Sequence, residues 1–159
     1  MLDTVQIGNF FDELGQAVKL PVDFLNQKLP FIKKENLNAL YACGYHYYEN
    51  GKYESALDVF RFLTKMDVTQ MKYWKGLGAC FQLLRNYHDA LEAYSRAAIL
   101  NPLDIDLHLN AADCCFATGQ IERGHQALDA VEQLANQKEE HEHFLEKLEL
   151  LKQVWPLEK

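Results

Sequence analysis

Residues 73–102 read YWKGLGACFQLLRNYHDALEAYSRAAILNP, and this stretch decides the fold. When the chain is shifted by 34 positions, small residues fall on small residues and bulky apolar residues fall on bulky ones. The aligned trios are Gly44/Gly78/Ala112, Tyr47/Phe81/Cys115, Tyr53/Tyr87/Ile121, Ala56/Ala90/Gly124 and Phe60/Tyr94/Leu128. A fixed period of this length indicates a stack of identical structural units.

The period and the residue types match the tetratricopeptide repeat, whose signature is followed by Trp74, Leu77, Gly78, Phe81, Ala90, Tyr94 and Pro102. We therefore expect an all-α superhelix of three helix-turn-helix repeats, at about 37–70, 71–104 and 105–138. The turn signals between apolar segments predict helices at 37–50, 53–66, 71–84, 87–100, 105–118 and 121–134. The small residues allow the two helices of each hairpin to approach closely, and neighbouring hairpins stack to bury their apolar faces.

The segments outside the repeats, 1–35 and 139–159, are predicted to be helical as well. In the N-terminal segment, Phe10, Phe11 and Leu14 belong to an amphipathic pattern. In the C-terminal segment, Leu148 and Trp155 belong to one apolar stripe, as expected for a helix that caps a solenoid.

Composition and charge exclude several classes of protein. The 159 residues carry a net charge of −7, which argues against a nucleic-acid or anionic-membrane surface. No apolar run of about 18 residues exists, so no membrane-spanning helix is expected. The first residues lack the basic region of a signal peptide, and we therefore expect a cytoplasmic protein with reduced cysteines.

No pattern of catalytic or metal-binding residues emerges. The four cysteines form no CxxC pair, and we interpret them as small buried hydrophobic residues. His141 and His143 face different sides of a helix, so a solvated acidic surface is the favoured interpretation. We conclude that the chain is a binding protein and not an enzyme, with no cofactor and no metal.

The first helix of each repeat carries a second stripe of side chains, which the packing within the hairpin does not use and which is available for ligand binding. At about 100° per residue, Tyr41, Tyr45 and Tyr48 lie roughly 100° from the packing stripe of Leu40 and Gly44. The same rotation in later repeats gives Lys72, Lys75, Ala79 and Gln82, then Asp106, Leu109, Asp113 and Phe116. The stripe predicts a concave groove with aromatic walls that takes an extended peptide, with Ala79 leaving room at its centre. Alternatively, the tyrosines cover the N-terminal segment.

Three blocks, LYACGYHYYENGKYESALDVFRFLTKMD, YWKGLGACFQLLRNYHDALEAYSRAAILN and NAADCCFATGQIERGHQAL, resemble the class II chaperones of bacterial type III secretion, which serve hydrophobic translocators. The resemblance implies a homodimer formed through the N-terminal segment, with Phe10, Phe11 and Leu14 as our candidates. It also implies a groove that binds a Pro-x-Leu-x-x-Pro segment near the translocator's N-terminus and keeps the client soluble and secretion-competent. By residue match, the aromatic pockets would be lined by Tyr41, Tyr45, Tyr48, Tyr53 and Phe60. The rotation argument adds Lys75, Ala79, Leu109 and Phe116.

The main alternative is a general tetratricopeptide adaptor for another peptide partner. One subclass of adaptors grips a C-terminal carboxylate with Lys, Asn and Arg, but the corresponding positions here include Tyr41, Tyr45 and Asp106. An enzyme that uses His141 and His143 is a weaker alternative. One departure from the repeat is Gly124 in place of Ala, which we expect to loosen the third hairpin by up to about 1 kcal/mol.

Overall fold

The computed structural model describes residues 34–137 and 142–155. The proposed dimer residues Phe10, Phe11 and Leu14 and the histidine His141 lie outside the described residues, as does most of segment 1–35.

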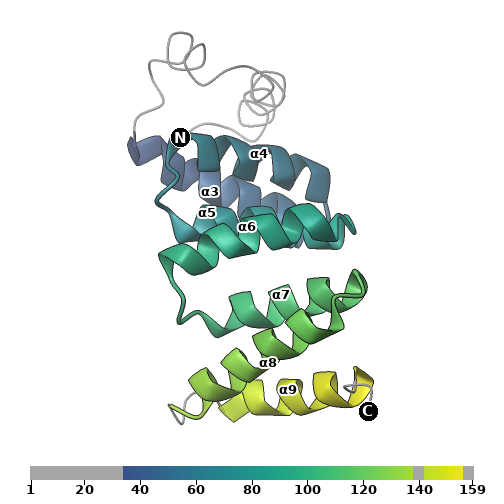
Figure 1. The fold of residues 1–159 in the computed structure, drawn as a ribbon. Coiled ribbons are helices and arrows are strands. Elements are labelled where there is room, and N and C mark those ends of the chain that lie inside the picture. The colour runs from purple at the N-terminus through teal and green to yellow at the C-terminus, as the bar shows by residue number, and fades with distance from the viewer. Residues whose placement is uncertain (1–33, 138–141, 156–159) are drawn as a thin grey trace.

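The described residues form helices joined by short turns, and the helix pairs stack along one axis (Figure 1). Their bounds are α3 (Lys34–Glu49), α4 (Tyr53–Met66), α5 (Met71–Leu83), α6 (Tyr87–Leu100), α7 (Ile105–Ala117), α8 (Ile121–Ala135) and α9 (Glu142–Val154). The predicted all-α fold with three helical hairpins is confirmed, as is a helix after the third hairpin. The sequence placed the start of the first repeat helix three residues late. Among the described residues, no helix has the length and apolar character needed to cross a membrane.

The turn inside each hairpin has the same geometry. Residue 51, 85 or 119 takes a positive φ, of 73°, 60° and 74° respectively. In each turn the next backbone N–H donates to a carbonyl five residues earlier: Lys52 to Tyr47, Asn86 to Phe81 and Gln120 to Cys115. This pattern closes the helix and satisfies its last carbonyls. Two of the three positive-φ residues are glycines, but the second turn uses Arg85.

Aromatic rings fill the space that the small residues leave within each hairpin. A Cβ on Gly78 would lie 2.6 Å from a ring atom of Tyr94, and a Cβ on Gly124 would lie within about the same range of Phe116. Gly124 is therefore required by packing, and the expectation that it loosens the third hairpin is wrong. The Phe116 ring occupies the volume that the alanine methyl group would need.

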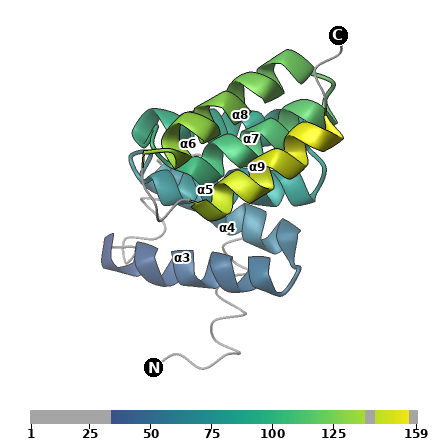
Figure 2. The ribbon, with the colours of Figure 1, turned by 90° about the horizontal axis from the view of Figure 1, so that it is seen from below.

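The buried side chains fall into two clusters. The larger one joins α3 to α6 and is centred on residues such as Phe60, Phe62 and Tyr94. The smaller one joins α7, α8 and α9 around residues such as Leu109 and Leu128. Helix α7 contributes to both clusters, because Leu107 and Cys114 belong to the first. Helix α9 packs mainly against α8 at the end of the stack, and the view from below shows it in front of the last hairpin (Figure 2).

The cysteines are packing residues, as the sequence indicated. Cys80, Cys114 and Cys115 are buried, and Cys43 is half-buried. Burial raises the pKa of Cys43 to about 11 and that of Cys80 to about 12, so both thiols stay protonated at neutral pH.

Candidate functional site: an aromatic pocket in the groove

One pocket of about 420 Å³ opens on the side of the stack formed by the first helices of the three repeats. It is lined by Tyr41, Tyr45, Tyr48, Phe60, Met71, Lys72, Lys75, Gly76, Ala79, Asp106 and Asn110. Six of the nine peptide-binding residues proposed from the sequence meet here: Tyr41, Tyr45, Tyr48, Phe60, Lys75 and Ala79. The pocket is thus assembled from α3, α5 and α7, with one residue from α4.

The tyrosines on α3 form a continuous row of rings. Tyr41 and Tyr45 stack at 6.5 Å between centroids, and Tyr45 and Tyr48 stack at 6.4 Å. Tyr53, at the start of α4, continues the row with an edge contact to Tyr48 at 5.8 Å, but it does not line the pocket. Tyr45 is 48% exposed, so a large aromatic surface faces solvent at the mouth of the pocket. An exposed aromatic surface of this kind is typical of a binding site.

The phenol groups of Tyr41 and Tyr48 remain neutral hydrogen-bonding groups. Burial raises the pKa of Tyr41, and the neighbouring Tyr45 raises it further, against a smaller lowering effect of Lys75. Burial likewise raises the pKa of Tyr48. At physiological pH each hydroxyl can both donate and accept a hydrogen bond, which suits the N–H and C=O groups of an extended peptide.

The floor of the pocket depends on a close approach between α4 and α5. Phe60 is 1% exposed, and its ring packs edge-on against Tyr41 at 5.9 Å. A Cβ on Gly76 would lie 2.6 Å from the Phe60 ring, so only glycine leaves the ring in this position. The site prediction omitted Gly76; its equivalent in the third repeat, 34 residues on, is Asn110, which also lines the pocket.

Lys72 lies at the rim of the pocket and was proposed only as part of the stripe. Its ammonium group lies 4.7 Å from the centroid of Tyr41 and 5.5 Å from that of Tyr73. It also donates to Asn38 Oδ1 at 3.2 Å. These contacts hold the lysine against the aromatic row, where its charge interacts favourably with the ring faces.

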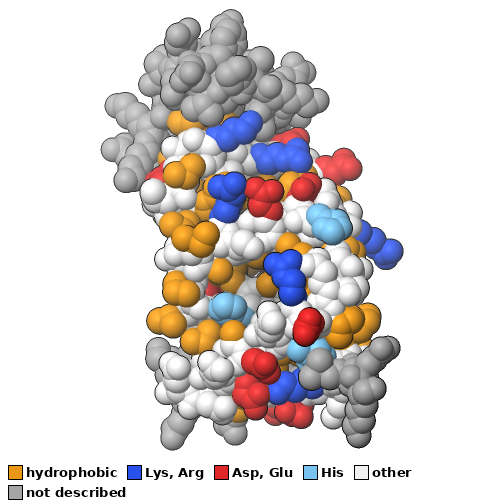
Figure 3. Space-filling model, in the orientation of Figure 1, with side chains coloured by type: hydrophobic (Ala, Val, Ile, Leu, Met, Phe, Trp, Pro, Cys, Tyr) orange, Lys and Arg blue, Asp and Glu red, His pale blue; other side chains and the backbone are white. Residues whose placement is uncertain are grey.

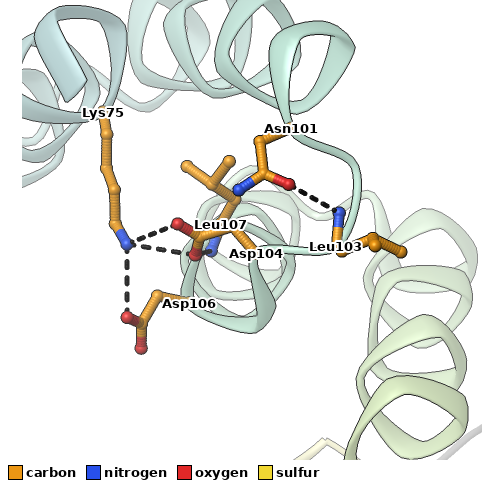
Figure 4. A network of polar contacts seen from close by, with 6 residues as sticks. All are labelled: Lys75, Asn101, Leu103, Asp104, Asp106 and Leu107. Atoms are coloured by element: carbon orange, nitrogen blue, oxygen red, sulfur yellow. Dashed lines mark hydrogen bonds and ion pairs between the residues drawn. The ribbon is translucent and has the colours of Figure 1, made fainter. Parts of the chain in front are cut away.

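The wall opposite the tyrosines carries an ion cluster of Lys75, Asp104 and Asp106, which we call the Lys75 cluster (Figure 4). The Lys75 ammonium group lies 2.9 Å from Asp104 Oδ2 and 3.2 Å from Asp106 Oδ2. Burial alone would lower the pKa of Lys75, but the hydrogen bonds and charges of Asp104 and Asp106 raise it above its ordinary value. Lys75 therefore stays positively charged within a compensating acidic environment.

Leu109 and Phe116 are not brought to the pocket. Leu109 is fully buried and Phe116 is 3% exposed, and both belong to the cluster that α7 shares with α8 and α9. Trp155 stacks on Phe116 with centroids 5.3 Å apart and ring planes 6° apart. The C-terminal helix therefore covers part of the third-repeat face that the rotation argument assigned to the groove.

The side chains on the face shown in Figure 3 have no single charge sign. Lys and Arg side chains alternate with Asp and Glu, while hydrophobic side chains gather along one edge. Exposed apolar residues of the described part include Val68, Ile99 and Leu103, near the loops between repeats. An alternating surface of this kind provides no continuous basic stripe for nucleic acid.

The stacked hairpins and the aromatic pocket define a tetratricopeptide-repeat protein with a peptide-sized groove. Two family models, each described as tetratricopeptide repeat, match residues 37–68 and 84–148. These matches place the chain among the tetratricopeptide-repeat proteins, and the proteins similar to it include translocator chaperones of type III secretion.

Among the similar proteins is low calcium response locus protein H of Yersinia pestis. It is 31% identical over 109 residues, which cover 69% of this chain and 65% of that protein. The chain thus spans about 65% of the length of this curated relative.

Two solved complexes are also similar. The type III secretion chaperone SycD of Yersinia enterocolitica, in complex with a peptide of the translocator YopD, superposes with a TM-score of 0.73 at 27% identity. That match covers 77% of this chain and 94% of SycD. PcrH of Pseudomonas aeruginosa, in complex with the chaperone binding region of PopD, has a TM-score of 0.73 at 28% identity and covers 77% and 92% of the two chains.

Proposed function

We propose that this protein is a chaperone of type III secretion that binds an extended segment of a hydrophobic translocator in the aromatic pocket. The observation that carries the proposal is the row of Tyr41, Tyr45 and Tyr48 over the Phe60 floor, with Tyr45 48% exposed. Relatives of the same fold are described in complex with translocator peptides. A client segment of the Pro-x-Leu-x-x-Pro type, near the N-terminus of the translocator, fits a pocket of rings and small residues.

The side chains of the pocket support binding of a client and not catalysis. The pocket offers the phenol groups of its tyrosines, the amide of Asn110 and a lysine whose charge two carboxylates already neutralise. An extended peptide loses conformational entropy when it is ordered, so we expect a modest groove affinity that permits release at the secretion apparatus. Holding the client itself requires no ATP. We therefore propose a non-enzymatic protein that needs no cofactor and works in the bacterial cytoplasm.

We also propose that the chaperone works as a homodimer through Phe10, Phe11 and Leu14. The support is the amphipathic pattern of the N-terminal sequence. Phe10→Glu or Leu14→Glu places a charge in the apolar stripe and should convert the dimer to a monomer in sedimentation equilibrium. An unchanged mass would reject this interface.

The binding proposal is tested by co-purification with the translocator encoded beside the chaperone gene. Tyr45→Ala combined with Tyr41→Ala should reduce the amount of co-purified translocator at least about tenfold, because two rings of the row are lost. Far-ultraviolet circular dichroism should show the wild-type helix content for this variant.

Tyr87→Ala is the matched control, because Tyr87 is a partly buried tyrosine on α6 outside the pocket. It should bind the translocator like the wild type. Equal loss in both variants, or unfolding of the double variant alone, would contradict a binding role for the tyrosine row. Capture of unrelated soluble proteins with no translocator would favour the general adaptor.

A further inference from the structure

The Lys75 cluster joins two repeats across the pocket. Lys75 lies on α5 in the second repeat, whereas Asp104 and Asp106 flank the first residue of α7 in the third repeat. Figure 4 shows the lysine side chain reaching from α5 to both carboxylates at the start of α7. Asp106 and Asn110 on α7 form one wall of the pocket, so the position of α7 relative to α5 determines its width.

The hydrogen bonds of the lysine are fully used within the protein. Its ammonium group has three N–H donors, and three carboxylate oxygens lie in range: Asp104 Oδ1 at 3.0 Å, Asp104 Oδ2 at 2.9 Å and Asp106 Oδ2 at 3.2 Å. No donor is left for a carboxylate on a ligand. Lys75 is therefore unlike a lysine that clamps a peptide C-terminus, which must present its charge to the ligand.

Asp104 has a second bond that couples the cluster to the helix itself. Its Oδ1 accepts from the backbone N–H of Leu107 at 3.2 Å and so caps the N-terminus of α7. Among the N-caps described for helices α4 to α8, only this one makes a side-chain hydrogen bond. The carboxylate that Lys75 grips thus also fixes the first turn of α7.

Within the cluster, the Lys75–Asp104 pair is partly shielded from solvent, whereas the Asp106 side chain is 54% exposed. The Asp104 side chain is 14% exposed and that of Lys75 is 31% exposed, so solvent and salt screen this pair less than a surface ion pair. We propose that Lys75 is a positioning residue: it does not bind the client but holds α7 against α5 and thereby sets the width of the pocket. This inference rests on the proposed peptide-binding function of the same pocket.

The test compares Lys75→Met and Asp106→Asn with a matched control, Lys152→Met. Lys152 pairs with Glu132 at 2.7 Å between α9 and α8, and its side chain is 30% exposed, close to the 31% of Lys75, but it lies outside the pocket. The probe is a fluorescein-labelled synthetic peptide of the chaperone binding region of PopD, measured by fluorescence anisotropy. Hydrogen–deuterium exchange of each chaperone without peptide is the second measurement.

Positioning by Lys75 has a distinct signature. Lys75→Met should weaken peptide binding about fivefold and speed amide exchange in the first turn of α7, around Leu107, before any peptide is added. Asp106→Asn should also weaken binding, and the double variant should bind no more weakly than Lys75→Met alone. Lys152→Met should change neither measurement at α7.

Opposite results overturn the inference. If Lys75 bound the client directly, Asp106 would compete for its charge, and Asp106→Asn would tighten binding. Unchanged exchange at the first turn of α7 in Lys75→Met would also reject a positioning role. If the wild type binds neither this peptide nor its own translocator, the proposed function fails, while the exchange measurement still decides whether Lys75 positions α7.

Discussion

Gly124 shows how one residue adapts a repeat to its neighbours. The repeat pattern favours alanine at this position, yet a Cβ would collide with Phe116. The Phe116 ring cannot easily move away, because Trp155 stacks on it at 5.3 Å and His125 packs edge-on at 5.4 Å. Space around this ring, and not helix propensity, determines the residue.

We predict that Gly124→Ala destabilises the protein by about 1–3 kcal/mol, since overpacking outweighs the gain in helix propensity. Urea unfolding followed by circular dichroism measures the change. Gln126→Ala, an exposed position on the same helix, should leave the unfolding midpoint unchanged. A Gly124→Ala protein more stable than the wild type would mean that the ring relocates freely.

Arg85 occupies the left-handed turn position that the other two hairpins give to Gly51 and Gly119. A left-handed conformation costs a residue with a Cβ roughly 1–2 kcal/mol. Glycine avoids this cost, but it loses more conformational entropy on folding, which offsets part of the gain. Arg85→Gly should therefore stabilise the protein by about 0.5 kcal/mol in urea unfolding. Gly119→Arg, the reverse change at the equivalent turn, should destabilise the protein. If both variants changed the free energy of unfolding in the same direction, the strain assigned to Arg85 would be contradicted.

At the scale of the elements, α9 depends on a small number of contacts. Leu148 is 1% exposed and belongs to the C-terminal cluster, whereas Leu150 on the same helix is 63% exposed. We predict that Leu148→Ala costs about 2–4 kcal/mol and that Leu150→Ala costs less than about 0.5 kcal/mol. Hydrogen exchange should show the loss of stability in α7 to α9, because each repeat unit contacts only its neighbours and is stabilised by them. Equal loss in α3 and α4 would contradict this.

The elements also show what the sequence could and could not reveal. The period of 34 residues predicted the helical hairpins because side-chain size repeats wherever helix packing repeats. The same period placed Tyr41, Tyr45, Lys75 and Ala79 on one face, and they do line one pocket. It failed for Leu109 and Phe116, because a periodic argument treats every repeat as having the same neighbours. The third repeat is followed by α9, and no signal within the repeat itself indicates which face that helix covers.

At the scale of the whole molecule, buried phenol groups link stability to alkaline pH. Burial raises the pKa of Tyr41, Tyr48 and Tyr94, and the carboxylates around Lys75 raise its pKa against the effect of burial. The folded state therefore retains these protons more strongly than the unfolded state. Their contribution to stability is complete below the ordinary pKa of about 10 and is lost as the pH rises through the folded values.

We predict that the urea midpoint is constant up to about pH 9 and falls above about pH 10. For the buried rings, the ultraviolet absorbance of tyrosinate should rise together with the loss of helix signal. A midpoint that stays constant beyond about pH 11 would show that burial of these tyrosines does not couple to folding.

Each half of the stack contains one of the chain's two tryptophans. Trp74 packs against the N-terminal cluster, where its indole N–H donates to the Val68 carbonyl at 2.9 Å. Trp155 lies on Phe116 at the C-terminal end. Replacing either tryptophan with phenylalanine would leave a single tryptophan, and selective excitation of that indole would follow the unfolding of one half without an attached dye.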